Sequence, residues 1–274
     1  MKEFLVSIVI PMYNASGTIE KTLMSINDQS YKNYEIIIVD DGSNDDSVKK
    51  VERFFNEFKG LRYIIIKQKN MGVSVARNKG LKVSKGDLIA LLDSDDYWKS
   101  NKLEEQIKVL QEHPQIDLLA TNRNGESYKR FFLKRLNQLN PISCRMMMYK
   151  NFLITPTVVF KKEILGTTGF FDERLTHAED WDYFIRITKN YQAYLLNKSL
   201  VITGEGKPNF GHSGLSANLW KMYVAERKTI RKAKESKAIG ALEVLIIEPF
   251  LFLKFLRRVI ISLIKKRFKS IYAV

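Results

Sequence analysis

Short apolar runs rich in β-branched residues alternate with helix-spaced stretches along residues 7–112 of this chain. The apolar runs are 7–10, 35–39, 63–66 and 88–92, and the helix-spaced stretches lie near 17–29, 45–58, 73–83 and 99–112. Because helical crossovers connect parallel strands, this alternation predicts an α/β fold with a mostly parallel sheet flanked by helices. Sheets of this kind bind ligands at the carboxyl ends of their strands, so the residues after each strand are candidates for a site.

Polar and acidic residues follow three of these runs. The sequence reads Pro11-Met12-Tyr13-Asn14 after the first run, Asp40-Asp41-Gly42-Ser43 after the second and Asp93-Ser94-Asp95-Asp96 after the fourth. The three carboxylates of the last group repel one another unless a cation or a proton neutralises them. Oxygen ligands without cysteine favour Mg²⁺ or Mn²⁺, with substrate phosphates as further ligands. We therefore expect a divalent metal here; the alternative is that Asp95 or Asp96 only caps the helix expected near Lys99.

Motifs and composition exclude several classes of protein. The first turn lacks the glycine pattern of dinucleotide-binding Rossmann domains, and the chain contains no Walker A sequence. With 45% hydrophobic and 27% charged residues and no internal repeat, the chain is neither disordered nor a repeat array. Cys144 is the single cysteine, which excludes an internal disulfide and fits a reducing compartment. The first apolar run fits a strand that ends at Pro11 rather than a leader, so we expect a cytoplasmic protein.

Five motifs occur in order along the chain: SIVIPMYNA, IIIVDDGSNDDS, NMGVSVARNKGL, KGDLIALLDSDDYW and AEDWDYFIRI. Together they resemble glycosyltransferase family 2, whose members have the GT-A fold and transfer sugars from nucleotide sugars with inversion at the anomeric carbon. The resemblance covers about residues 5–190. It implies a Rossmann-like, mostly parallel mixed sheet in a catalytic domain over residues 1–217, followed by a helical extension over 218–274.

The resemblance implies a nucleotide pocket at the first three motifs. Pro11, Tyr13 and Asn14 would line the pocket for the base. Asp41 would accept a hydrogen bond from the imide N–H of uracil, while Asp40 and Ser43 would fix the turn; the alternative is a plain turn before a helix cap. Arg77 would lie on the nucleotide side of the cleft, pairing with phosphate or stacking on the base, unless it is only a helix-surface arginine.

The resemblance also implies a metal site. Asp93, Ser94, Asp95 and Asp96 match the metal motif, whose carboxylates approach the ribose and a metal that bridges the diphosphate. The spacing favours Asp95 as the direct ligand, without excluding Asp93 or Asp96. His212 would add a metal ligand or close over the diphosphate, within a flap that contains Lys207 and the glycines Gly204, Gly206, Gly211 and Gly214; the alternative is a polar loop histidine.

The remaining motif implies the base that activates the acceptor. Asp180 matches the general base, and Glu179 would orient the base or the acceptor. Trp181 would offer a flat face to the acceptor sugar, and its alternative is a packed helix residue. His177 is more simply a surface residue at the start of that helix.

Basic residues concentrate at the C-terminal end. The chain carries a net charge of +15, and residues 218–274 hold 14 Lys and Arg against 4 Asp and Glu. Over residues 250–269 the basic residues fall on one side of a helical wheel and apolar residues fill the rest, with Pro249 suited to the first turn. Charges interrupt the apolar run below the about 20 residues that span a bilayer, so we expect an amphipathic helix lying on an anionic membrane. The alternative is a helix packed on the catalytic domain or on a partner subunit in a homo-oligomer.

These observations predict a metal-dependent, inverting glycosyltransferase on the inner face of the cell membrane. It would transfer a hexosyl or N-acetylhexosaminyl group from a nucleoside-diphosphate sugar, UDP being favoured, to a hydroxyl of a glycan or lipid-linked acceptor in cell-surface polysaccharide synthesis. One alternative is a nucleotidyltransferase on a related sheet, although its glycine-rich phosphate loop is missing. Another is a non-catalytic basic module for membrane or nucleic acid; the clustered acids argue against nucleic acid.

Overall fold

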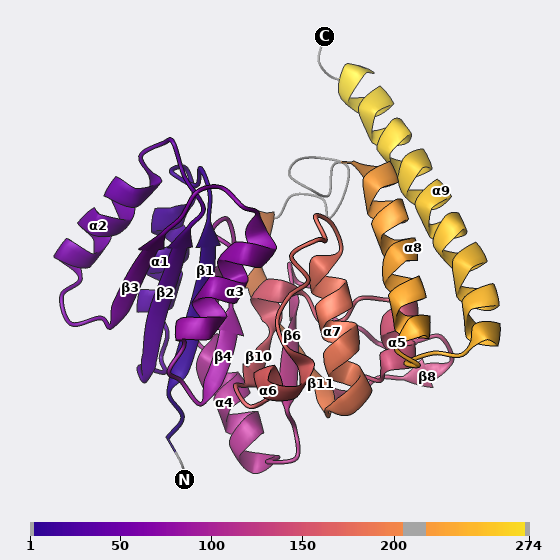
Figure 1. Ribbon diagram of the computed structural model, residues 1–274, viewed down its shortest axis with the longest axis horizontal. Coiled ribbons are helices and arrows are strands. Elements are labelled where there is room, and N and C mark those ends of the chain that lie inside the picture. The colour runs from indigo at the N-terminus through magenta and orange to yellow at the C-terminus, as the bar shows by residue number, and fades with distance from the viewer. Residues whose placement is uncertain (1–2, 205–217, 272–274) are drawn as a thin grey trace.

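A sheet with helices on both faces forms the body of the protein (Figure 1). The structure is a computed structural model that describes residues 3–204 and 218–271. Its strands are β1 (Val6–Met12), β2 (Tyr34–Asp40), β3 (Tyr63–Lys67), β4 (Leu88–Leu91), β5 (Tyr97–Trp98), β6 (Leu118–Arg123), β7 (Arg130–Phe131), β8 (Lys134–Arg135), β9 (Leu139–Pro141), β10 (Val159–Lys161) and β11 (Ala193–Ile202). Its helices are α1 (Ile19–Asn27), α2 (Ser47–Glu57), α3 (Val73–Val83), α4 (Lys102–Glu112), α5 (Cys144–Tyr149), α6 (Ile164–Thr168), α7 (Glu179–Asn190), α8 (Leu219–Glu235) and α9 (Ala241–Ile271), with a 3-10 turn η1 (Thr155–Thr157). The strands and helices predicted over residues 7–112 are all present.

The sheet is mixed, as expected, and its order brings several strand ends together. The order is β3-β2-β1-β4-β10-β6-β11-β5, and β9 also pairs with β11. Strands β3, β2, β1 and β4 are parallel. Because β10 is antiparallel to both β4 and β6, β6 runs parallel to β4. The carboxyl ends of β1, β2, β4 and β6 therefore lie at one edge of the sheet.

Alternate residues of the parallel strands face two separate hydrophobic cores. Val9 and Ile37 belong to the core shared with α3, α5, α7, α8 and α9. Ile8 and Ile36 belong to the core shared with α1, α2 and α4. Successive strand side chains point to opposite faces, so covering both faces requires the nearly continuous apolar runs seen in the sequence.

Strand β1 continues through Pro11, so the expectation that Pro11 ends it is wrong. Val9 bonds toward β4, because its carbonyl oxygen accepts from the Leu92 N–H at 3.1 Å. Pro11, two positions later, faces the same side, beyond the last paired residues of β1 and β4. A proline at that point leaves no ladder hydrogen bond unmade.

The C-terminal helices pack on the same body as the catalytic motifs. Helix α9 begins at Ala241, so Pro249 lies inside the helix rather than in its first turn. Ile247 and Leu251 are 2% and 0% exposed, in the core that also contains α7. The alternative of packing on the catalytic domain is thus confirmed for these residues. Among the described residues, no helix combines the length and apolar composition needed to cross a bilayer.

The faces of α9 are arranged differently from the expected amphipathic helix. Lys254 and Arg258 turn inward to Glu226 of α8, with distances of 3.1 and 2.9 Å to its Oε1. Apolar side chains instead face outward: Leu253 is 64% exposed and Ile260 is 57% exposed. The buried carboxylate of Glu226 explains this arrangement, because a buried charge requires a partner.

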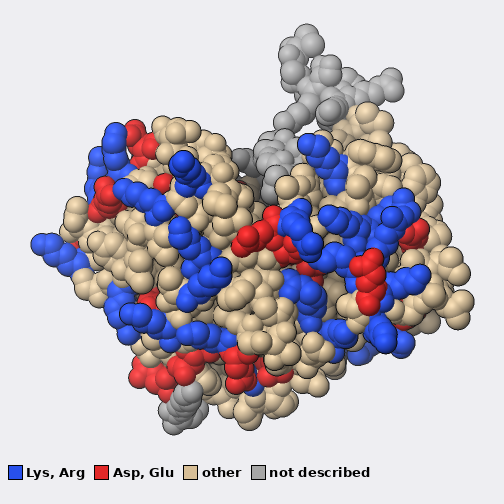
Figure 2. Space-filling model, in the orientation of Figure 1, with Lys and Arg blue, Asp and Glu red and all other residues tan. Residues whose placement is uncertain are grey.

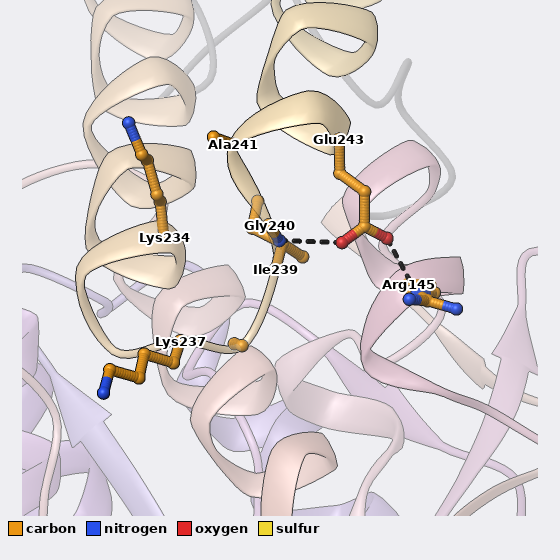
Figure 3. Close-up of a pocket in the computed structure, with 8 residues that line it drawn as sticks. Arg145, Lys234, Lys237, Ile239, Gly240, Ala241 and Glu243 are labelled. Carbon is orange, nitrogen blue, oxygen red and sulfur yellow. Dashed lines mark hydrogen bonds and ion pairs between the residues drawn. The ribbon is translucent and has the colours of Figure 1, made fainter.

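The turn between α8 and α9 is anchored to α5 (Figure 3). The Glu243 carboxylate accepts from the Gly240 N–H at 2.8 Å and pairs with the Arg145 side chain at 2.7 Å. Lys234 and Lys237 line the same pocket from the other side and point away from Glu243. The helical hairpin is therefore held at its turn as well as along its length.

We expect Leu251→Ala to lower the free energy of unfolding by about 2–5 kcal/mol, because it removes a fully buried side chain from the core. Leu253→Ala is the matched control on the exposed face of the same helix, with an expected change within about 0.5 kcal/mol. Urea unfolding, monitored by tryptophan fluorescence, measures the free energy of unfolding of both variants. Equal effects of the two substitutions would contradict the packing of α9 on the catalytic domain.

Candidate active site

The acidic turn of residues 93–96 follows β4 at the carboxyl edge of the sheet and is held by helix α1. Thr18 Oγ1 donates to the Ser94 carbonyl oxygen at 2.8 Å, and Thr22 Oγ1 donates to the Asp96 carbonyl oxygen at 2.8 Å. Sequence reasoning missed these two threonines. Their spacing by one helical turn was the only local signal, and it does not reveal which loop they contact.

Asp96 is buried within this turn, and its carboxylate accepts from the Gly204 N–H at 2.7 Å. Burial, together with the charges of Asp93 and Asp95, raises the pKa of Asp96 to about 8. Helix α4 has Asn101 as its N-cap, so the alternative that Asp95 or Asp96 caps that helix is wrong. The fold therefore gathers three carboxyl groups in this turn without using them to cap α4.

Arg77 joins the acidic turn to the motif that carries the expected base. It lies on α3, is only 4% exposed, and stands over the Phe171 ring at 5.3 Å. Its Nη2 donates to Asp93 Oδ1 at 2.8 Å and its Nη1 donates to Glu179 Oε1 at 2.9 Å. Burial disfavours the charge, but the two carboxylates outweigh it and raise the pKa of Arg77 above its ordinary value. Both terminal nitrogens thus bind protein carboxylates in this structure, which differs from the phosphate or base contact expected for Arg77.

Asp180 lies in the first turn of α7, next to Glu179. Ala178, just before the helix, has a φ of 55°, a left-handed conformation that non-glycine residues rarely adopt and that often marks functional sites. The Asp180 carboxylate accepts from the Trp181 N–H at 2.7 Å and from Asn151 Nδ2 at 3.3 Å. Asn151 is a third site residue that sequence reasoning missed, because it lies in a distant loop.

The environment of Asp180 suits proton transfer near neutral pH. Burial and the charge of Glu179 raise the pKa of Asp180 to about 7, while the charge of Arg77 acts in the opposite direction. A carboxylate with this pKa is ionised for part of the time at neutral pH and is a stronger base than an ordinary aspartate.

Asp41 organises the loop between β3 and α3. Its Oδ1 accepts from Gln68 Nε2 at 2.7 Å and from the Met71 N–H at 2.8 Å, and its Oδ2 accepts from the Gly72 N–H at 2.8 Å. A carboxylate has about four acceptor positions, so a further donor, such as the imide of a base, can still be accommodated.

The turn at residues 40–43 is a hydrogen-bonded network, as expected. The Ser43 N–H donates to Asp40 Oδ1 at 3.2 Å, and Ser43 Oγ accepts from the Asn14 N–H at 2.9 Å. Gly42 has a φ of 78°, and a Cβ on it would lie 2.8 Å from the Asn70 nitrogen. Glycine is therefore required for both its conformation and the close approach of the neighbouring loop.

The expected binding residues differ in their exposure. Tyr13 is 48% exposed and accessible to a base, whereas Pro11 is buried beneath the turn. Trp181 is 4% exposed, lies in the hydrophobic core, and donates from its indole nitrogen to the Met147 carbonyl oxygen at 2.8 Å. The structure therefore places Trp181 in the core, not on a surface that could stack on an acceptor sugar. Its helical spacing had left both possibilities open.

The acidic turn fits a divalent cation only in part. His212 lies outside the described residues, together with Lys207, Gly206, Gly211 and Gly214. Within the part of the chain that the structure describes, no three His, Cys, Asp or Glu side chains are arranged to hold a metal by themselves. Asp93 is engaged by Arg77, whereas Asp95 is exposed on the turn. One exposed carboxylate completed by diphosphate oxygens and water is a donor set that Mg²⁺ and Mn²⁺ accept.

Comparison with known proteins assigns the family. The family described as "Glycosyl transferase family 2" matches residues 7–168. The chain belongs to glycosyltransferase family 2. The matched region contains the turns at residues 11–14 and 40–43, Arg77 and the acidic turn, while Asp180 lies after it.

Several curated glycosyltransferases are similar to this chain. The UDP-Glc:alpha-D-GlcNAc-diphosphoundecaprenol beta-1,3-glucosyltransferase WfgD of Escherichia coli is 30% identical over 228 residues, which cover 81% of this chain and 83% of that protein. The amylovoran biosynthesis glycosyltransferase AmsB of Erwinia amylovora is 32% identical over 202 residues, which cover 69% of this chain and 65% of that protein. The match to the putative teichuronic acid biosynthesis glycosyltransferase TuaG of Bacillus subtilis covers 42% of that protein. The chain thus spans less than two thirds of the length of AmsB and TuaG.

Solved structures confirm the GT-A fold of this family 2 chain. The structure of S. aureus TarS 1-349 in complex with UDP-GlcNAc has a TM-score of 0.67 and 22% identity to this protein. The alignment covers 92% of this protein and 72% of the TarS chain. The mannosyltransferase PcManGT from Pyrobaculum calidifontis, in complex with GDP-Man and Mn²⁺, matches 93% of this chain and 71% of that chain, with a TM-score of 0.70 and 20% identity.

We expect Arg77→Gln to lower the free energy of unfolding by about 3–5 kcal/mol, because it leaves two largely buried carboxylates without their cation. Arg174→Gln is the control, since Arg174 is 83% exposed and its pair with Asp172 is expected to contribute about 0–1 kcal/mol. Chemical denaturation at pH 8 measures both values. A loss for Arg77→Gln no larger than that of the control would show that the bridge does not support the fold.

Proposed function

We propose that the chain is a metal-dependent, inverting glycosyltransferase that transfers a sugar from a UDP-sugar to a hydroxyl of a glycan or lipid-linked acceptor. The Arg77 bridge is the observation that carries this proposal. It ties the acidic turn, suited to a diphosphate and its cation, to the helix end that carries a carboxylate with a pKa near neutrality. Nucleophilic transfer of a sugar requires that the site of the leaving group and the base be held in fixed relative positions, and the Arg77 bridge can hold them so.

On the donor side, the nucleoside would bind at the turns after β1 and β2. Tyr13 offers an accessible ring, and Asp41 offers its remaining acceptor position to the uracil imide. The diphosphate would lie at residues 93–96, with Asp95 as the direct ligand of Mg²⁺ or Mn²⁺. When bound, such a cation stabilises the negative charge that develops on the leaving diphosphate. The presence of GDP-Man in PcManGT makes GDP the competing nucleotide in any donor test.

On the acceptor side, Asp180 takes the proton of the attacking hydroxyl. As the hydroxyl oxygen bonds to the anomeric carbon, the bond from that carbon to the diphosphate oxygen breaks, and its electron pair leaves with the nucleoside diphosphate. Attack from the face opposite the leaving group inverts the anomeric configuration. Glu179 and Asn151 position the base, Glu179 through Arg77 and Asn151 by direct donation to Asp180.

The relatives and the C-terminal hairpin support an acceptor at a membrane. WfgD acts on a GlcNAc-diphosphoundecaprenol acceptor, as its name states, and TarS binds UDP-GlcNAc. Leu245 and Leu253 of α9 are 71% and 64% exposed in a chain with a net charge of +15, which favours association with anionic lipid. We therefore propose that the enzyme works in cell-surface polysaccharide synthesis on the inner face of the cell membrane.

Asp180→Asn should reduce turnover by about two to four powers of ten, because a positioned base contributes roughly that much. Donor binding should be unchanged, since the substitution preserves size and lies outside the nucleotide turns. The measurements are UDP release from the UDP-sugar that a donor screen selects, and UDP titration by calorimetry. Asp182→Asn is a poor control because Asp182 is buried and paired, so the exposed Asp28→Asn serves instead. Wild-type turnover in Asp180→Asn would contradict the assignment.

The pH profile should report the raised pKa of Asp180. The base acts only when ionised, so kcat/KM is expected to be high above pH 7 and to fall as the pH drops through about 7. Asn151→Ala removes a hydrogen bond to the charged form and should move this fall to higher pH. A profile that is flat from pH 8 to pH 5, or one that Asn151→Ala leaves in place, is incompatible with this role for Asp180.

Binding of UDP should depend on a divalent cation through Asp95. Calorimetric titration is expected to show tighter UDP binding with Mn²⁺ than with EDTA. Asp95→Asn should weaken the Mn²⁺-supported binding by about tenfold or more, a loss typical of removing one partner at a metal site. Asp28→Asn again provides the exposed control. Equal UDP affinity in Mn²⁺ and EDTA would argue against a metal-dependent donor site.

A further inference from the structure

We infer that the β7–β8 hairpin is a second membrane-contact element, which inserts its tip into an anionic bilayer beside the outer face of α9. The hairpin spans residues 129–136 and forms a two-stranded sheet separate from the main sheet. At its tip, Phe132 is 64% exposed and Leu133 is 98% exposed. This inference rests on the proposed membrane association of the enzyme and adds a site that α9 alone does not provide.

The hairpin is held firmly at its base although its tip is exposed. Phe131 packs edge-on against Phe152, with ring centroids 5.2 Å apart. The Leu136 N–H donates to the Lys129 carbonyl oxygen at 3.0 Å, and the Leu136 side chain is buried. Leu133, at 98% exposed, therefore contributes almost nothing to the packing of the fold, and its exposure in water beside the largely exposed Phe132 requires another explanation.

Basic residues bracket the tip on both strands. Lys129 and Arg130 precede it, and Lys134 and Arg135 follow it. All four are exposed, and none forms an ion pair with another residue of the described ranges 3–204 and 218–271. An apolar tip surrounded by unpaired cations is complementary to a bilayer interface, where acyl chains lie beneath anionic headgroups.

The tip adjoins the exposed face of α9. Phe132 lies edge-on to Tyr149 at 5.5 Å, and Tyr149 lies edge-on to Phe250 of α9 at 5.3 Å. Exposed apolar residues recur along α9 at helical spacing: Leu242, Leu245, Ile246, Leu253, Leu256 and Ile260. In Figure 2 basic side chains lie over both halves of this face, including the half that carries α7, α8 and α9. Tip and helix thus form one continuous surface of apolar and basic residues.

A bilayer fits this surface better than a second copy of the chain. A two-fold contact would bring the four unpaired cations of one tip against the same patch of its partner, and like charges at an interface oppose association. Anionic lipid instead complements them. The hairpin tip and the outer face of α9 would together fix the tilt of the catalytic domain on the membrane, because α8 packs on α9 and is joined to α7 by the pair of Lys232 with Asp182 at 2.5 Å.

The test compares full-length variants in sedimentation with vesicles of phosphatidylcholine and phosphatidylglycerol. Leu133→Glu is expected to lower the vesicle partition coefficient by about tenfold or more, as withdrawal of one leucine side chain from the interface should do. Met24→Glu, an exposed position on α1, is the matched control and should bind like wild type. Arg130→Gln combined with Arg135→Gln should weaken binding to these vesicles but not to pure phosphatidylcholine.

The outcomes separate this inference from the proposed function. All variants should bind UDP like wild type, which excludes misfolding as the cause of lost vesicle binding. The inference is overturned if Leu133→Glu has the same vesicle partition coefficient as the wild type, or if the wild type does not bind vesicles. Either result leaves the glycosyltransferase proposal intact. A wild-type dimer in light scattering that Leu133→Glu converts to a monomer would assign the surface to self-association and also overturn it. Failure of UDP to bind the wild type would count against the proposed function alone.

Discussion

The buried guanidinium of Arg77 is the interaction on which the candidate active site depends. It binds Asp93 from the turn after β4 and Glu179 from the start of α7, two acidic groups that would otherwise repel each other. A buried charge without its partner is strongly destabilising, so each of the three side chains constrains the position of the other two. The turn after β4 and the start of α7 are thereby fixed relative to each other.

This internal cation neutralises only part of the acidic charge. Asp93 and Glu179 are paired with Arg77, whereas Asp96 and Asp180 have raised pKa values, in each case with burial as the largest cause. Asp95 remains exposed on the turn. The acidic residues therefore fall into three groups: Asp93 and Glu179, which pair with Arg77; Asp96 and Asp180, whose pKa values are raised; and Asp95, which is exposed.

The C-terminal hairpin follows the same electrostatic principle. Glu226 is buried between α8 and α9, and it draws Lys254 and Arg258 inward. The sequence alone would place Lys254 and Arg258 on a solvent-exposed face, but both form ion pairs inside the hairpin. Leucine and isoleucine side chains are exposed on the outside instead. Inward-facing charges beside exposed leucines and isoleucines are unusual for a helix pair in water, which is why we propose a lipid partner for the outer surface.

The sequence alone determined the strand–helix alternation, the strand ends that carry the acids, and the family, because periodicity and short motifs are local properties. It also predicted the turn at residues 40–43, which the structure shows as a hydrogen-bonded network, whereas the role of Asp180 as a base stays a prediction. Only the tertiary structure decided the partners of Arg77, the burial of Trp181, the holding of the acidic turn by Thr18 and Thr22, and the direction of Lys254. Helical spacing says which residues share a face, but the element that covers that face is set by contacts between distant segments.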